Sequence, residues 1–345
     1  MTGEVQPQLV LERKFVTWQI DARRDMDGSK HTLPRRFGKA AASAIIATTV
    51  LAFSPLGASA ASAIDPANMA FGYADKTGMK LLALGDDDNT PLDAAHANAL
   101  VEAVCANGQA LPIRYLRMQQ ASPASNGRQS DGNFTNEGGP LFEVTAGRAE
   151  PDDTCMLVPA DYTQAFPVIR NDVPEPERQA LESAYWRAVE AADERNQPVD
   201  VSPFHAPTDF AKKSLGALEK ARDRAVKLYW PLFRSGSSQE VAAIEFAPEG
   251  DSLLGTLVLV EAGRLSFPDM PASLKKGLAD GGCWSVDDEC RFDVAEMNVP
   301  AVLGKPGEQL IFFTTESTEG QFIRLLQVNA GKLVELKHAY RYRAT

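Results

Sequence analysis

The fold is decided by the stretch Phe322-Ile-Arg-Leu-Leu-Gln-Val-Asn-Ala-Gly-Lys-Leu-Val-Glu-Leu336, in which two apolar runs flank a short turn that contains glycine. Two to five residues that include Gly are enough to reverse a β-strand, so the stretch predicts a hairpin. Runs of the same kind lie upstream, at Val241–Phe246, Thr256–Val260, Arg264–Phe267 and Leu310–Thr315. We therefore expect residues 231–345 to form an antiparallel, β-rich domain of meanders.

The turn in this stretch recurs along the chain. A displacement of 68 residues superimposes Val260-Glu-Ala-Gly-Arg-Leu265 on Val328-Asn-Ala-Gly-Lys-Leu333, and Val144-Thr-Ala-Gly-Arg148 contains the turn once more. A duplicated meander would produce this pattern. Ala-Gly followed by a basic residue is also simply a good hairpin turn, and we adopt that simpler interpretation.

Two helices are predicted before the β-rich domain, in a helical connector that spans residues 174–230. The first follows the capping box Asp172-Val-Pro-Glu175, carries apolar residues at helical spacing and ends before Gln197-Pro198. The second is expected from Thr208 to about Lys227, with its charged residues on the outer face. The pair would form a hairpin or a strut between β-rich parts.

Residues 61–173 are predicted to form a mixed α+β domain. Apolar residues at helical spacing after Thr90-Pro91 predict a helix that Gly108 ends. Residues 121–139 are almost wholly polar, so they are expected to be a mobile loop. Short apolar runs predict strands at Lys80–Leu84, Leu111–Met118, Leu141–Val144, Met156–Val158 and Phe166–Ile169.

The sequence thus predicts an α+β protein, with an N-terminal mixed α/β part, a central pair of helices and a C-terminal antiparallel β-meander part.

Residues 1–60 are interpreted as an N-terminal extension and a secretory signal. The basic stretch Leu33–Lys39 precedes 14 uncharged residues, Ala40–Phe53, and small-residue triplets place cleavage after Ala60 or Ala63. The apolar run is too short to span a membrane, so no membrane anchor is expected after cleavage. Both Met1 and Met26 stay open as the start of the chain, and both the general and the twin-arginine export routes stay open. A periplasmic or secreted protein is predicted.

All four cysteines follow the predicted cleavage site, and an even number in an oxidising compartment indicates two disulfides. Cys283 and Cys290 enclose only six residues and are expected to pair, which leaves Cys105 with Cys155. Zinc is disfavoured because no C-x-x-C spacing occurs and the histidines are distant from one another in the sequence.

Composition and charge limit the classes of partner. The chain has 345 residues with 44% hydrophobic content, enough for a sizeable core. It carries 46 acidic against 35 Lys and Arg residues, a net charge of −11. Such a chain repels phosphate backbones, so nucleic acid is not an expected partner.

No complete catalytic motif is present. Ser273-Leu-Lys-Lys276 has the spacing of the Ser-Lys element of penicillin-recognising enzymes, but it follows Lys76-Thr-Gly78 instead of preceding it. His96 and His338 are interpreted as structural, and neither a cofactor nor a metal site is predicted. His205 and the turn at Asp287–Asp288 stay open as members of an active site that only the fold would assemble.

The predicted function is that of a soluble exported protein, a non-catalytic binding or envelope-accessory protein, whose partner is an unknown polypeptide, glycan or small ligand. The alternative is an exported hydrolase whose site is not visible as a motif. Candidate binding positions are Trp284, Asp287, Asp288, Tyr340 and Tyr342.

Overall fold

The computed structural model describes residues 65–85, 92–160, 162–195, 197, 199–250, 252–268, 272–275, 294, 297–317 and 319–343. The chain divides into two units, Met1–Ala60 and Ala61–Thr345, and every described residue belongs to the second. The predicted signal therefore lies outside the described residues. Among these residues, no helix combines the length and the apolar character needed to cross a membrane.

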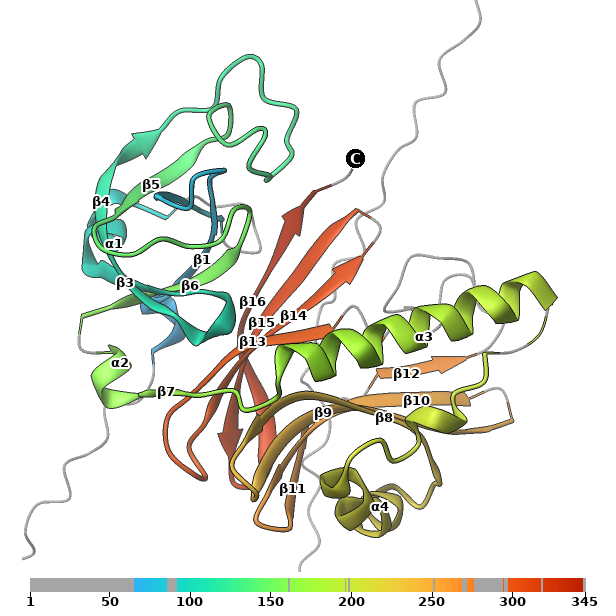
Figure 1. The fold of residues 1–345 in the computed structure, drawn as a ribbon. Coiled ribbons are helices and arrows are strands. Elements are labelled where there is room, and N and C mark those ends of the chain that lie inside the picture. Colours follow the sequence, from blue (N-terminus) through green and yellow to red (C-terminus); the bar gives the residue numbers. More distant parts are fainter. Residues whose placement is uncertain are drawn as a thin grey trace, which may run out of the picture. The chain divides into compact units, whose positions relative to one another are not determined.

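The predicted α+β class is wrong, because the protein is mostly β. Of the described residues, 46% lie in strands and 22% in helices. The strands form two sheets, one of which is a closed barrel (Figure 1).

The barrel replaces the predicted mixed α/β part. Its strand order is β1-β2-β5-β4-β3-β6, and β6 returns to β1 with every pair antiparallel. The strands are β1 (Ala70–Ala74), β2 (Lys80–Ala83), β3 (Leu100–Val104), β4 (Ala110–Gln119), β5 (Gly139–Val144) and β6 (Thr154–Pro159). The 3-10 turns η1 (Pro66–Asn68) and η2 (Ala106–Gly108) lie before β1 and before β4.

The helix predicted to reach Gly108 is much shorter than expected. Helix α1 (Ala94–Ala99) is capped by the side chain of Asp93, and the chain then enters β3. Alanines and leucines suit a helix as well as a buried strand, so local spacing misled the prediction. Pairing of β3 with both β4 and β6 closes the barrel, and this tertiary gain overrides helix propensity.

The two predicted central helices exist, but they do not share a core. Helix α3 (Glu175–Arg195) places Tyr185 and Val189 in one hydrophobic cluster, whereas α4 (Asp209–Arg222) places Ala211 and Leu218 in another. Figure 1 shows them beside different parts of the sheet. The shorter elements α2 (Tyr162–Ala165), β7 (Val168–Ile169) and η3 (Ser202–Phe204) complete this region.

The second sheet has ten strands in the order β7-β13-β14-β15-β16-β11-β10-β9-β8, with β12 paired to β10. All neighbours are antiparallel except β11 and β16. Their short parallel pairing joins a first meander, β8–β11, to a second meander, β13–β16. The strands after β7 are β8 (Val226–Ser235), β9 (Gln239–Glu249), β10 (Ser252–Glu261), β11 (Arg264–Pro268), β12 (Ala272–Lys275), β13 (Met297–Leu303), β14 (Leu310–Ser317), β15 (Gly320–Asn329) and β16 (Lys332–Tyr342).

The two meanders correspond strand for strand. Adding 68 to the bounds of β10 gives the bounds of β15, and the same addition moves the start of β11 onto the start of β16. Ala262-Gly263 and Ala330-Gly331 both have positive φ angles, the signature of a type I′ turn. This agreement favours a duplicated meander over the simpler interpretation adopted from the sequence.

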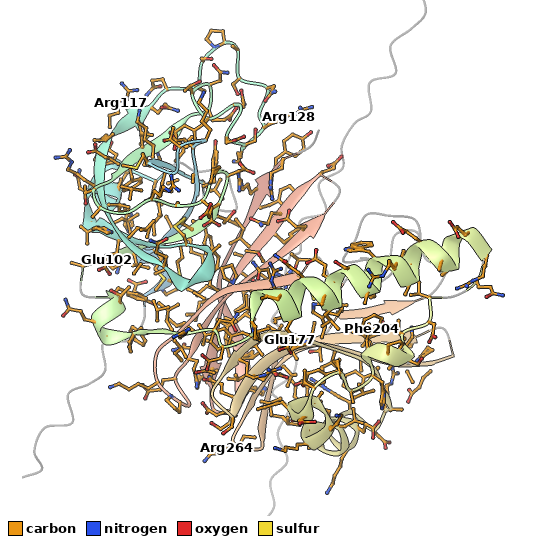
Figure 2. The ribbon with its side chains drawn as sticks, viewed as in Figure 1. Glu102, Arg117, Arg128, Glu177, Phe204 and Arg264 are labelled. Carbon is orange, nitrogen blue, oxygen red and sulfur yellow. A yellow bond between two sulfur atoms is a disulfide. The ribbon has the colours of Figure 1, made fainter. Side chains whose placement is uncertain are left out.

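Each half of the sheet is covered on both faces. The cluster around Tyr185 and Trp230 lies between α3 and residues of both meanders, and Phe204 packs into it (Figure 2). Helix α4 covers the other face of the first meander. The barrel covers the other face of the second meander, where Phe71 stacks on Phe312.

Candidate functional site

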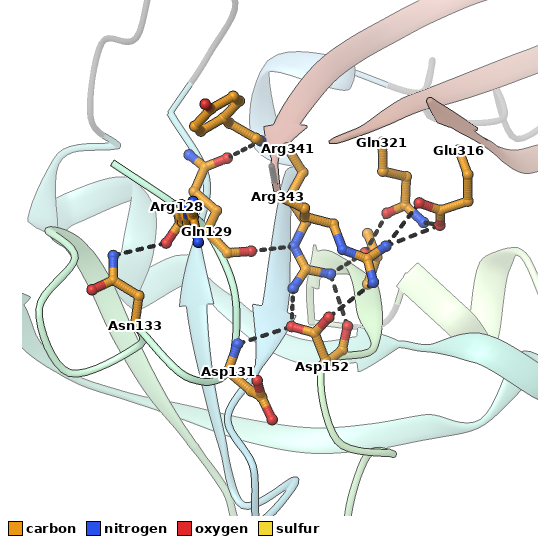
Figure 3. Close-up of polar contacts among 11 residues, drawn as sticks. Arg128, Gln129, Asp131, Asn133, Asp152, Glu316, Gln321, Arg341 and Arg343 are labelled. Carbon is orange, nitrogen blue, oxygen red and sulfur yellow. Dashed lines mark hydrogen bonds and ion pairs between the residues drawn. The ribbon is translucent and has the colours of Figure 1, made fainter. Parts of the chain in front are cut away.

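A buried arginine connects the barrel to the second meander. Arg341 of β16 is fully buried, and its guanidinium donates to the backbone oxygens of Gln129 (2.7 Å) and Asp152 (2.8 Å) and to the hydroxyl of Thr154 (2.9 Å). It also forms an ion pair with the carboxylate of Asp152 and lies 4.5 Å from the ring centre of Tyr73. Figure 3 shows this network.

A second arginine extends the network toward solvent. Arg343 donates to Oδ2 of Asp152 (2.9 Å) and to both carboxylate oxygens of Glu316 (2.8 and 3.0 Å). Gln321 of β15 donates to Glu316 (2.5 Å) and accepts from Thr154 (2.5 Å). Two arginines and two carboxylates thus neutralise one another across the junction between barrel and sheet.

The segment predicted to be a mobile loop takes part in this network. Gln129 binds Arg341 through its backbone oxygen and accepts from the N–H of Tyr342 through its side chain (2.9 Å). Phe134 is buried against Tyr73 in the hydrophobic cluster between the barrel and the second meander, and Asn133 is 6% exposed. These contacts argue against the predicted mobility, because one inserted aromatic ring and many local hydrogen bonds offset the ordering entropy.

A pocket of about 270 Å³ opens beside the network. Its wall comes from the turn before β6, from η2 and from one end of β13, β14 and β15. The lining residues are Ala106, Glu150, Pro151, Asp152, Asp153, Thr154, Asn298, Pro300, Thr314, Glu316, Gln321 and Arg343. We call this the junction pocket.

Two carboxylates of the junction pocket lack the compensation that the others have. Glu150, which is exposed, and Asp153, which is half-buried, form no salt bridge among the described residues. Asp153 accepts a hydrogen bond from the N–H of Ala106 (3.0 Å). Burial raises the pKa of Asp153 to about 6, against the lowering effects of the backbone N–H groups of Ala106 and Thr154 and of the charge of Arg341. The junction pocket is therefore polar and acidic, and it holds a carboxyl group whose pKa is raised by burial to about 6.

The sulfur atoms of Cys105 and Cys155 lie at disulfide-bonding distance, 2.03 Å, as the sequence predicts. Both cysteines are buried, and Asp153 is their close neighbour: its carboxylate and both sulfur atoms lie within 4.8 Å of one another. Because sulfurs joined in a disulfide are poor metal ligands, this group of three residues gives no reason to expect zinc. Cys283 and Cys290 lie outside the described residues.

The candidate binding positions from the sequence are not brought together at the junction pocket. Trp284, Asp287 and Asp288 lie outside the described residues. Tyr340 is 39% exposed and packs its ring against Phe322, 4.8 Å away. Tyr340 and Tyr342 alternate along β16 with Arg341, so their side chains are on the face opposite that arginine.

The histidines and the serine singled out from the sequence also lie elsewhere. His205 follows η3, His96 is in α1 and His338 pairs with Glu335 (2.8 Å), and none of the three lines the junction pocket. Ser273 is in β12, away from the lining residues.

Sequence reasoning missed Asp152, Asp153, Arg341 and Arg343 as a group. The partner of Arg341, Asp152, is 189 residues away in the sequence, so no local pattern connects the two. The available signal was the strand period, which aligns Arg341 with the core residue Ala339. A charged residue on a core-facing position requires a buried partner.

Comparison of the sequence and the fold with protein-family models, with curated proteins and with solved structures finds no match.

Proposed function

We propose that this chain is an exported, non-catalytic binding protein whose junction pocket takes a small polar ligand that carries an ammonium group. The observation that carries the proposal is the charge distribution of the pocket. Arg341 and Arg343 neutralise Asp152 and Glu316, whereas Glu150 and Asp153 have no salt bridge among the described residues. A ligand cation would supply that missing charge.

The rest of the lining suits a hydrophilic ligand. Thr154, Thr314 and Gln321 are buried polar residues at the pocket wall, and Asn298 adds an amide. The volume of about 270 Å³ is slightly below the roughly 300 Å³ at which pockets for drug-sized molecules begin, so a small amine or amino sugar is the appropriate size.

Export is part of the proposal and has two supports. Residues 33–60 have the organisation of a secretory signal, and the Cys105–Cys155 pair is of the kind that persists in oxidising compartments.

The binding proposal is tested with ligands that differ only in charge. We compare putrescine with 1,4-butanediol and glucosamine with glucose by isothermal titration calorimetry at pH 7.5, on wild type, Asp153→Asn and Glu143→Gln. The asparagine keeps the acceptor for Ala106 but cannot ionise. We expect an amine to bind wild type, and Asp153→Asn to weaken it about tenfold, the equivalent of about 1.4 kcal/mol.

Glu143→Gln is the matched control, because Glu143 pairs with Arg114 on the exposed barrel surface and does not line the pocket. Affinity should also rise as pH increases through about 6, where Asp153 becomes ionised. Equal affinity for an amine and its uncharged counterpart, or equal loss in both variants, would contradict the proposal.

The alternative, an exported hydrolase, has one specific observation in its favour. A carboxyl with a pKa of about 6 in a pocket with other carboxylates is a common property of general acids. Ester, peptide, phosphate and glycoside substrates assayed at pH 5.5 distinguish the two functions. Turnover that Asp153→Asn abolishes and Glu143→Gln preserves would replace the binding proposal by the enzymatic one.

A further inference from the structure

A second groove shares no lining residue with the junction pocket and is mainly apolar. It has a volume of about 220 Å³ and runs between α4 and the tips of the β8–β9 and β10–β11 hairpins. Its floor is apolar and its rim carries one lysine and several serine hydroxyls. Its lining residues include Phe210, Lys213, Ala217, Ser238, Val260 and Leu265.

Helix α4 presents a separate face to this groove. Phe210, Lys213 and Ala217 are spaced by three and four residues, so they lie along one side of the helix. Ala211 and Leu218 are on the side that packs into the sheet and are completely buried. Lys213 and Ala217 are exposed, so these two side chains can change without removing the contacts that hold the helix, whereas Phe210 also packs against the cluster.

The charge of the groove is opposite to that of the junction pocket. No acidic residue is among its described lining residues, although the chain as a whole has a net charge of −11. Lys212 takes Asp209 as its partner (2.9 Å), and Lys213 has no ion-pair partner in the described part of the chain.

We propose that this groove binds a medium-chain carboxylate, with its hydrocarbon chain on Phe210, Val260 and Leu265 and its carboxylate at Lys213. The apolar floor favours burial of methylene groups, at roughly 0.8 kcal/mol for each one fully buried. The lysine and the neighbouring serine hydroxyls are the donors that a carboxylate requires. A cationic ligand would find no carboxylate partner among the described lining residues of this groove.

The test compares two probes with the same chain and opposite charge, octanoate and octylammonium, by NMR titration of the complete protein. We expect octanoate to shift the amide signals of residues 210–217 and 260–265, and octylammonium to leave them unchanged. Lys213→Glu should weaken octanoate at least fivefold, about the effect of one ion pair near the surface, and should permit octylammonium to bind.

Lys220→Glu provides the matched control, because Lys220 is an exposed lysine on the same helix that does not line the groove and the change alters net charge equally. A third variant, Ala217→Trp, fills the groove from an exposed helix position and should abolish octanoate binding with the circular dichroism spectrum unchanged. The proposal is overturned if octanoate binds Lys213→Glu as tightly as Lys220→Glu, or if the amide signals that octanoate shifts belong to residues outside the groove. Neither result depends on the junction pocket.

Discussion

At the scale of single residues, burial and charge act in opposite directions on Asp153. Removal from water is the largest effect and raises its pKa from 3.8 to about 6, although the backbone N–H groups of Ala106 and Thr154 and the charge of Arg341 favour ionisation. The folded protein therefore holds this proton more tightly than the unfolded chain. Stability contributed by the protonated form is present at acidic pH and is lost as pH rises from about 4 to about 6.

We expect Asp153→Asn to stabilise the protein at pH 8 by about 2 to 3 kcal/mol, because asparagine avoids the cost of burying the charge. Below pH 4 the two proteins should be equally stable. Urea unfolding at both pH values measures the difference between variant and wild type, so other titrating groups cancel. A variant that is less stable than wild type at pH 8 would show that the Asp153 charge stabilises the fold.

At the scale of secondary-structure elements, the two type I′ turns have an unfavourable residue in common. Ala262 has a φ of 47° and Ala330 a φ of 50°, and alanine in this left-handed region costs about 1 kcal/mol. The third Ala-Gly pair, at residues 146–147, does not form the predicted hairpin turn, because the preceding strand β5 pairs with β2 and β4 and not with the following strand β6. There Gly147 has positive φ (76°) and Ala146 does not.

Ala262→Asn and Ala330→Asn should each stabilise the protein by about 0.5 to 1 kcal/mol, since asparagine tolerates the left-handed conformation and Asn-Gly is the preferred type I′ pair. Ala146→Asn serves as the control and should give no gain. The measurement is the midpoint of urea unfolding for the three single variants and for the double variant. Equal stabilisation at all three positions would indicate an effect of asparagine unrelated to the turn.

At the scale of the whole described unit, Arg341 is the residue on which the contact between barrel and sheet depends. It forms hydrogen bonds to Gln129, Asp152 and Thr154, all of which belong to the barrel region, from a strand at the other end of the chain. Breaking a buried ion pair from one side leaves an uncompensated charge, which costs several kcal/mol.

Arg341→Met is expected to destabilise the protein by about 3 to 5 kcal/mol. Arg114→Met, which removes an arginine from an exposed ion pair of the barrel, should change stability by no more than about 0.5 kcal/mol. Urea unfolding of both variants provides the comparison. Similar small losses in the two would mean that packing, and not the Arg341 network, holds barrel and sheet together.

The elements that sequence reasoning predicted well are those whose pattern is local. Strands β9, β10, β14 and β15 have apolar runs bounded by turns, and α3 begins at the predicted capping box. The segment Leu100–Val104 was assigned to a helix because its strand partners, β4 and β6, are invisible locally. The predicted boundary between the helical connector and the β-rich domain, at residue 230, divides β8 in half, because its partner β9 is equally invisible locally.

Local spacing or a residue count was enough to predict the hairpins at Ala262-Gly263 and Ala330-Gly331, the two long helices and a Cys105–Cys155 pair, whose sulfur atoms lie at bonding distance. Closure of the barrel, the parallel joint between β11 and β16 and the junction pocket were decided only by the tertiary structure. The physical reason is that a buried charge such as Arg341 is stable only beside its partners. Those partners, Asp152 and Gln129, become its neighbours through the packing of two sheets.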